Sequence, residues 1–247
     1  AVPFDPWSSG KPKKPAPPFA FIPPGLHSRE YAEDESVALA FCFWGRGVQS
    51  LPLFAEILRE MGNQGLERGV VRFDLIGIDA EDATGSSTII WRQDEDFAAM
   101  APPIIPVGWW LENLSLSEER LTLRFHTPAR LISQNKPLFQ PEFAEIFPFI
   151  LRRVTSILQY YCDFDRKIDG PRLVEQAAEL TTVRQSLSWQ DWKNIGGRQG
   201  PGAVGGVVGE LVVEGEGLRD LLWIIALSSL LNIGKGAAFG AGNYTVE

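Results

Sequence analysis

The chain ends in Ile233-Gly-Lys-Gly-Ala-Ala-Phe-Gly-Ala-Gly-Asn-Tyr-Thr-Val-Glu247. This segment comes after a stretch with a helical pattern, and its last residues have a short strand pattern. Four glycines fall within nine of its residues: Gly234, Gly236, Gly240 and Gly242. Glycine allows positive φ and the close approach of another backbone. Nucleotide motifs place their glycines between a strand and a following helix, and this order is reversed, so we expect no nucleotide cofactor. Two interpretations remain open, a turn packed against a sheet and a loop that meets a phosphate backbone.

The second half of the chain alternates between strand and helix patterns. Strands are predicted at residues 120–126, 187–192, 204–213 and 243–246, and helices at 141–162 and 218–231. Their order is β-α-β-β-α-β, which is the order of a ferredoxin-like unit. The glycine-rich loop lies between the last helix and the last strand of this unit.

The first half predicts a shorter version of the same order. Strands are expected at residues 19–22, 36–44 and 70–78 and a helix at 51–61, and the boundary stretch that follows them is expected to carry a short strand near 87–91. This β-β-α-β order is a ferredoxin-like unit without its opening strand and helix. We therefore expect an α+β fold with a proline-rich arm at 1–18, a partial N-terminal ferredoxin-like domain at 19–106 and a complete one at 107–247.

Composition limits the classes of function. The net charge is −8, which argues against indiscriminate nucleic-acid binding. Between residues 121 and 172, however, bases outnumber acids, so the second half is expected to present a basic face. The longest apolar run, residues 221–227, is too short to cross a bilayer, and no membrane association is expected.

The two cysteines, Cys42 and Cys162, lie in apolar patterns and have neither metal-ligand nor disulfide spacing. We interpret them as small buried apolar residues, which fits a reducing cytoplasm. The chain begins at Ala1 without a signal-peptide pattern, and we expect that an earlier segment has been removed by processing or truncation.

Several stretches, in this order, resemble the RAMP superfamily of CRISPR-associated proteins, and most closely its repeat-RNA processing endoribonucleases, the sixth of the Cas proteins. The resemblance is carried by Pro18-Phe-Ala-Phe-Ile-Pro-Pro24, Phe41-Cys-Phe-Trp-Gly45, Leu53-Phe-Ala-Glu-Ile-Leu-Arg-Glu-Met-Gly62, Gly65-Leu-Glu-Arg-Gly-Val-Val-Arg-Phe73, Leu123-Arg-Phe-His-Thr-Pro-Ala-Arg-Leu131, Phe149-Ile-Leu-Arg-Arg-Val154 and the segment from Ile233 to Tyr244. It covers nearly the whole chain after residue 18, and the order of the stretches is its most specific part.

The resemblance implies tandem ferredoxin-like (RRM-like) domains and a metal-independent ribonuclease without cofactors. In that chemistry the 2′-OH beside the scissile phosphate attacks in line and leaves a 2′,3′-cyclic phosphate. The protein supplies a base, an acid and cationic donors. The implied partners are CRISPR repeat RNA and other CRISPR-associated proteins. Because the opening strand and helix are missing, an N-terminal piece or a dimer partner is a further candidate. The alternatives are a non-catalytic RAMP scaffold subunit and a ferredoxin-like interaction protein that does not bind RNA.

Candidate site residues follow from these patterns. His27, Tyr31 and His126 are candidates for acid, base or orienting hydroxyl, against the alternative of exposed residues without a role. The candidates for contact with RNA are the loop residues Gly234, Lys235, Gly236, Gly240 and Gly242 and the cations Arg124, Arg130, Arg152, Arg153 and Arg198. Lys235 is expected to offer a phosphate both its ammonium group and its backbone N–H. No metal site is expected.

Overall fold

A computed structural model describes residues 15–24, 31–66, 69–192 and 204–247 of the chain. The chain divides into two compact units. Residues 1–45 and 115–247 form the first, and residues 46–114 form the second.

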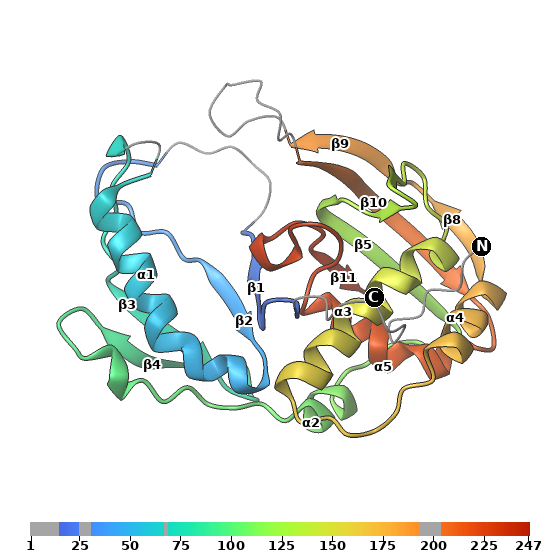
Figure 1. Ribbon diagram of the computed structural model, residues 1–247, viewed down its shortest axis with the longest axis horizontal. Coiled ribbons are helices and arrows are strands. Elements are labelled where there is room, and N and C mark those ends of the chain that lie inside the picture. Colours follow the sequence, from blue (N-terminus) through green and yellow to red (C-terminus); the bar gives the residue numbers. More distant parts are fainter. Residues whose placement is uncertain (1–14, 25–30, 67–68, 193–203) are drawn as a thin grey trace. The chain divides into compact units, whose positions relative to one another are not determined.

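The first unit contains the expected ferredoxin-like sheet (Figure 1). Its strands are β5 (Arg120–Ala129), β8 (Thr181–Gln185), β9 (Ser188–Trp192), β10 (Val204–Glu214) and β11 (Tyr244–Val246). The order across the sheet is β11-β5-β10-β8, with β9 also paired to β10, and every pairing is antiparallel. The first and third strands of the unit, β5 and β10, are therefore central, as a ferredoxin-like order requires.

Three helices pack together beside this sheet: α3 (Phe143–Tyr161), α4 (Gly170–Glu179) and α5 (Leu218–Ser229). Leu121, Leu123 and Phe125 alternate along β5 and are almost fully buried, so one face of the strand supplies the core. Helix α3 begins with a capping box formed by Glu142 and Glu145, which satisfies backbone donors at its first turn. The helices predicted at 141–162 and 218–231 are confirmed as α3 and α5.

Some element boundaries differ from those that the sequence predicted. Strand β5 continues through Thr127-Pro128 to Ala129, because the missing N–H of Pro128 falls beyond the residues that pair with β11. Helix α4 and strand β8 were not predicted. Asp169 caps α4 by accepting a hydrogen bond from the backbone N–H of Arg172 at 3.3 Å, and Pro171 lies in the first turn.

A two-stranded antiparallel ribbon belongs to the same unit. It consists of β1 (Phe19–Ile22) and β2 (Ala40–Phe43), which pair from Phe19 opposite Phe43 to Ile22 opposite Ala40. The strand at 19–22 was predicted correctly, whereas the buried strand expected at 36–44 is shorter and leaves Val37 and Leu39 about half exposed. The Cys42 thiol is enclosed, and burial raises its pKa to about 11.

The second unit is built on a helix and a hairpin. Helix α1 (Leu51–Gln64) runs two residues past Gly62, the predicted stop, and ends at Gly65. Strands β3 (Gly77–Glu81) and β4 (Ser87–Arg92) form an antiparallel hairpin, followed by a short helix α2 (Val107–Glu112). The hydrophobic core of this unit contains the buried residues Ala55, Trp91 and Phe97. The strand expected at 70–78 is wrong in position, because residues 77–81 pair with β4 and leave Val70 and Ile76 exposed.

Within the described residues, no helix has the length and apolar character that crossing a membrane would require.

Candidate nucleic-acid interface

The glycine-rich loop is a fixed turn whose backbone is bonded to the end of strand β5. The backbone N–H of Lys235 donates to Arg130 O at 2.9 Å, and that of Gly242 donates to Pro128 O at 3.1 Å. The base of the loop is closed by the N–H of Ile233, which donates to Gly242 O at 3.0 Å. The packed-turn interpretation is therefore correct for the backbone.

All four glycines of the loop have positive φ, between 65° and 92°. At two of them a side chain would also collide with backbone. A Cβ on Gly242 would lie 2.0 Å from Ile233 O, and one on Gly234 would lie 2.7 Å from Arg130 O. Glycine is needed there both for conformation and for close approach.

A buried polar network holds the loop from inside. Thr127 Oγ1 donates to Gly240 O at 2.6 Å and accepts from the backbone N–H of Asn243 at 2.8 Å. The side-chain amide of Asn232 donates to Ala237 O at 2.9 Å and to Phe21 O at 2.9 Å, which ties the loop to β1. Asn243 Nδ2 donates to Asn232 Oδ1 at 3.0 Å. A buried hydrogen-bond network of this kind makes the loop rigid.

Lys235 is exposed at the outer side of this rigid turn. Its ammonium group has no hydrogen-bond or ion-pair partner within the residues that the structure describes. Its backbone N–H, by contrast, is occupied by Arg130 O, so the expectation that this N–H would also serve a phosphate is wrong. The side chain alone is available for an anionic ligand.

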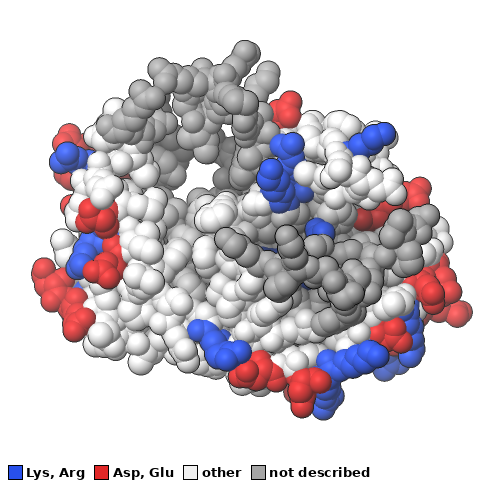
Figure 2. All heavy atoms as spheres, in the orientation of Figure 1, with Lys and Arg blue, Asp and Glu red and all other residues white. Residues whose placement is uncertain are grey.

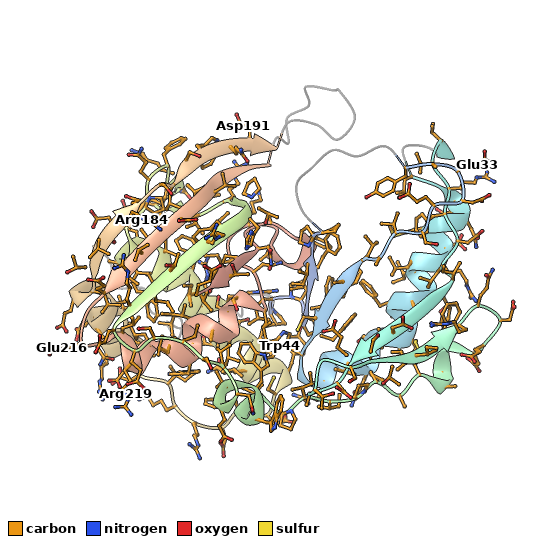
Figure 3. All side chains as sticks on the ribbon, turned by 180° about the vertical axis from the view of Figure 1, so that it is seen from behind. Glu33, Trp44, Arg184, Asp191, Glu216 and Arg219 are labelled. Atoms are coloured by element: carbon orange, nitrogen blue, oxygen red, sulfur yellow. The ribbon has the colours of Figure 1, made fainter. Side chains whose placement is uncertain are left out.

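Arg124 lies on the open face of the sheet, away from the helices. On β5 the residues Arg120, Thr122, Arg124 and His126 alternate with the buried apolar ones. Arg124 pairs with Glu210 at 2.9 Å and with Glu247 at 3.6 Å, and Glu210 also pairs with Arg184, which Figure 3 labels on this sheet. These carboxylates offset the positive charge of the open face, so it is not the basic surface that the sequence predicted.

The other predicted cations have different surroundings. Arg130 lies two residues before the short hairpin of β6 (Ile132–Ser133) and β7 (Lys136–Pro137), and its carbonyl accepts the hydrogen bond from the Lys235 backbone N–H. Arg152 is exposed on α3, with its guanidinium 5.0 Å from the ring centroid of Phe149.

Arg153 is buried, with 8% of its surface exposed. Its guanidinium donates to Leu231 O at 3.2 Å, Phe19 O at 3.1 Å and Pro17 O at 3.4 Å. Burial lowers the pKa of Arg153 to about 10, so it remains charged at neutral pH. These hydrogen bonds join α3 to β1 and to the end of α5. Arg153 therefore stabilises the fold and is not an RNA contact.

The structure describes two of the three catalytic candidates. His126 is exposed on β5, and its Nε2 lies 2.9 Å from Thr245 Oγ1 on β11. Its side chain points to the opposite face of the strand from Thr127, whose hydroxyl holds the loop. Tyr31 is half exposed. His27 and the predicted contact residue Arg198 lie outside the described residues.

Phe239 is a residue of the loop that was not among the predicted site residues. It ends the short 3-10 helix η4 (Ala237–Phe239), and 72% of its surface is exposed. Ala237 and Ala238, by contrast, are buried. An aromatic residue between glycines in a loop was the available signal, because core aromatics usually lie in regular elements.

Charge elsewhere is mixed. On the face drawn in Figure 2, Lys and Arg side chains occur in separate small groups interspersed with Asp and Glu.

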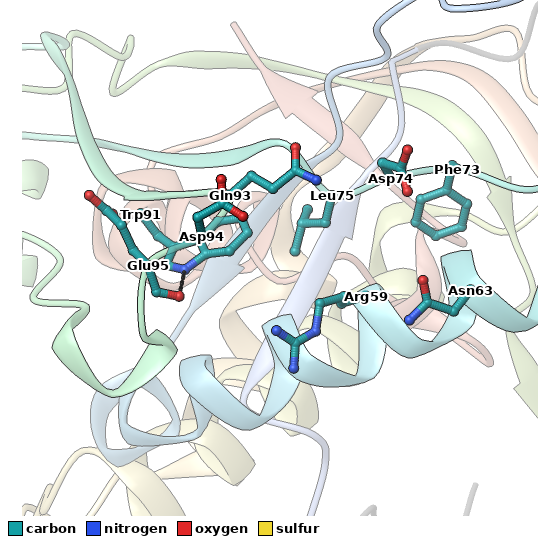
Figure 4. Close-up of a pocket in the computed structure, with 9 residues that line it drawn as sticks. All are labelled: Arg59, Asn63, Phe73, Asp74, Leu75, Trp91, Gln93, Asp94 and Glu95. Carbon is teal, nitrogen blue, oxygen red and sulfur yellow. Dashed lines mark hydrogen bonds between the residues drawn. The ribbon is translucent and has the colours of Figure 1, made fainter.

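The second unit contains a cavity of about 300 Å³ between α1 and the turn after β4 (Figure 4). Its charged lining is mainly acidic, with Asp74, Asp94 and Glu95 beside Arg59, and this disfavours an RNA phosphate. Among the described residues, no group of three or more His, Cys, Asp or Glu side chains is arranged to hold a metal ion.

Comparison with known proteins finds a family match for the second half of the chain. No curated protein matches the sequence. A family model described as CRISPR-associated endoribonuclease Cas6 matches residues 123–244, and a model described as an N-terminal domain matches residues 5–103. The first of these segments begins in β5 and ends at Tyr244 in β11, so it includes the ferredoxin-like unit and the glycine-rich loop.

Solved Cas6 structures share the fold. The product complex of a Thermus thermophilus Cas6 has a TM-score of 0.55 at 16% identity, covering 93% of this chain and 82% of that chain. The product complex of a second Cas6 has a TM-score of 0.50 at 16% identity, covering 93% and 84%. These matches confirm the expected α+β class of tandem ferredoxin-like domains. Residues 123–244, just under half of the chain, therefore match the CRISPR-associated Cas6 endoribonuclease family.

Proposed function

We propose that this chain binds CRISPR repeat RNA and cleaves it in a metal-independent reaction. The observation that carries the proposal is the rigid glycine-rich loop of the Cas6-matching segment, with Lys235 at its outer side. Product complexes of two Cas6 proteins with a similar fold support an RNA-processing role. We infer that the protein acts in the cytoplasm, where CRISPR transcripts are made.

The proposed reaction is a transesterification within the RNA. The 2′ oxygen attacks the adjacent phosphorus, and the bond from phosphorus to the 5′ oxygen breaks. The products carry a 2′,3′-cyclic phosphate and a 5′-OH. A base must remove the 2′ proton and an acid must protonate the leaving oxygen. We assign these roles to His27 and Tyr31 in the first instance, because His126 Nε2 is already within hydrogen-bond distance of Thr245.

Cations stabilise the negative charge that develops on the phosphorane. We propose Lys235 for this contact, with Arg130 beside it, because their backbones are joined by a hydrogen bond of 2.9 Å. The glycines Gly234, Gly236, Gly240 and Gly242 act by shaping the turn that presents Lys235. We propose Arg152 and Arg198 as further phosphate contacts, with Arg124 as a weaker one because carboxylates neutralise it.

The alternative is a non-catalytic scaffold that holds RNA in a complex with other CRISPR-associated proteins. One observation favours it: His126 has a hydroxyl partner on the open sheet face and points away from the side of β5 where Thr127 holds the glycine-rich loop. An interaction protein that does not bind RNA is the remaining alternative, and the acidic net charge of −8 favours it.

Incubation of end-labelled repeat RNA with the protein in EDTA separates these functions. We expect a single cut whose 5′ fragment ends in a cyclic phosphate, because the proposed chemistry needs no metal ion. Binding without cleavage would establish the scaffold. Failure to bind even at low salt would contradict both RNA functions.

Lys235→Ala is expected to weaken binding of the repeat RNA about tenfold, because one charge-assisted phosphate contact is lost. The slope of log Kd against log salt concentration should fall by about 1. Binding titrations at several salt concentrations measure both quantities. Lys167→Ala, which removes an exposed lysine from the loop before α4, is the matched control and should change neither. An unchanged slope for Lys235→Ala would remove this loop from the phosphate contact.

A further inference from the structure

The glycine-rich loop presents one aromatic ring outward. Phe239 is 72% exposed, although the two preceding residues, Ala237 and Ala238, are each only 5% exposed. A single exposed apolar residue is common on protein surfaces and needs no explanation by itself. The surroundings of Phe239, however, distinguish it from an isolated surface residue.

The ring of Phe239 is supported along one side by another aromatic ring. Its centroid lies 6.1 Å from that of Phe19, with the two planes at 78°, an edge-to-face contact. Phe19 in turn lies 5.9 Å from Phe43, the residue opposite it in the ribbon. This support restricts the orientation of Phe239 while most of its ring surface stays accessible.

The backbone beneath Phe239 is also fixed. Its N–H donates to Gly236 O at 2.9 Å, and the carbonyl of the next residue, Gly240, accepts from Thr127 Oγ1 at 2.6 Å. Asn232 holds Ala237 O at 2.9 Å on the other side. A rigid, already oriented aromatic ring loses little conformational entropy when it binds a partner.

Lys235 lies close to Phe239 along the backbone of the loop. Phe239 is one 3-10 turn beyond Gly236, a rise of ~6 Å, and Lys235 directly precedes that glycine. The loop thus presents an aromatic face and an ammonium group over the length of about one turn. Proteins that bind single-stranded RNA combine these two groups, because bases stack on aromatic rings while cations follow the phosphates.

We propose that Phe239 is a base-stacking residue, and that an unpaired nucleotide of the bound RNA places its base on the exposed ring while Lys235 contacts a phosphate beside it. This inference rests on the proposed function. The nucleotide is unpaired because the faces of bases inside a duplex are covered by their stacked neighbours. Phe239 is therefore expected to recognise the single-stranded part of the RNA rather than a helical stem.

Stacking and ionic contacts have different signatures in a binding titration. Replacing a stacking aromatic by alanine costs ~1–3 kcal/mol per base, so Phe239→Ala is expected to weaken binding of the repeat RNA by about 5- to 150-fold. Phe239→Trp should bind about as well as the wild type. Unlike Lys235→Ala, Phe239→Ala should leave the slope of log Kd against log salt concentration unchanged, because it removes no ion contact. Val183→Ala, at an exposed apolar position on β8, is the control and should bind normally.

A scan with abasic nucleotides tests the stacked base directly. In the wild type, one unpaired position of the repeat RNA should lose affinity when its base is removed, and in Phe239→Ala the same abasic RNA should lose none. If the wild type binds repeat RNA but Phe239→Ala binds equally well, or if no abasic position is coupled to Phe239, the inference fails while the proposed function stands. Absence of RNA binding by the wild type would overturn both.

Discussion

Gly242→Ala should lower the free energy of unfolding by about 4 kcal/mol, as expected for a left-handed conformation combined with a steric clash. Gly242 has φ +65°, and an added Cβ would lie 2.0 Å from Ile233 O. The same peptide groups close the base of the loop through the bond from Ile233 N–H to Gly242 O at 3.0 Å. The clash cannot be relieved by rotating a side chain, because the obstructing atom belongs to the backbone.

Gly236→Ala is the matched control for this change. Gly236 also has positive φ, +87°, but its added Cβ would lie 3.4 Å from Ala241 Cβ, an ordinary contact distance. Only the conformational cost of about 1 kcal/mol should remain. Urea unfolding of the two variants and the wild type measures the difference. Equal destabilisation by the two substitutions would contradict the close packing assigned to Gly242.

Arg153→Ala should destabilise the first unit by about 3 kcal/mol or more. The substitution leaves the carbonyls of Pro17, Phe19 and Leu231 without their charged donor and opens a cavity in the protein. The pKa of Arg153, lowered to about 10 by burial, keeps the group protonated at neutral pH, so the charged donor is present under ordinary conditions. Thermal and urea unfolding of the variant and the wild type measure this loss of stability.

The neighbouring Arg152→Ala provides the comparison. Arg152 is exposed on α3 and its guanidinium lies 5.0 Å from the Phe149 ring, a contact worth about 0.5–1 kcal/mol at an exposed site. We expect Arg152→Ala to reduce stability less than Arg153→Ala and, if Arg152 contacts phosphate, to reduce RNA affinity. If Arg153→Ala and Arg152→Ala lowered the free energy of unfolding equally, the stabilising role assigned to Arg153 would be wrong.

Much of the second half could be predicted from sequence because local patterns agree with the final fold. The apolar alternation in β5 and the long apolar face of α3 correspond to the buried residues of the structure. The position of the glycines predicted a special turn, and all four have positive φ. Helix α4, which was not predicted, has its own start signals in the sequence, Asp169 at the N-cap and Pro171 in the first turn.

Other features depend on tertiary contacts that a sequence pattern does not contain. The run at 70–78 is apolar enough for a strand, yet pairing with β4 selects residues 77–81. The charge of Arg153 suggested a solvent-exposed face of α3, whereas three distant carbonyls draw its guanidinium inward. The exposure of Phe239 depends on the tertiary fold of the loop, in which the buried amide of Asn232 donates to Ala237 O while Phe239 stays at the surface.

The most direct test of the account is to find which residues of the protein touch the RNA. Repeat RNA substituted with 4-thiouridine can be cross-linked by ultraviolet light to the wild-type protein, and the modified peptides identified by mass spectrometry. We predict adducts on the peptide that contains Lys235 and Phe239. Adducts confined to other segments, with the glycine-rich loop unmodified at every substituted position, would contradict the claim that this loop holds the RNA.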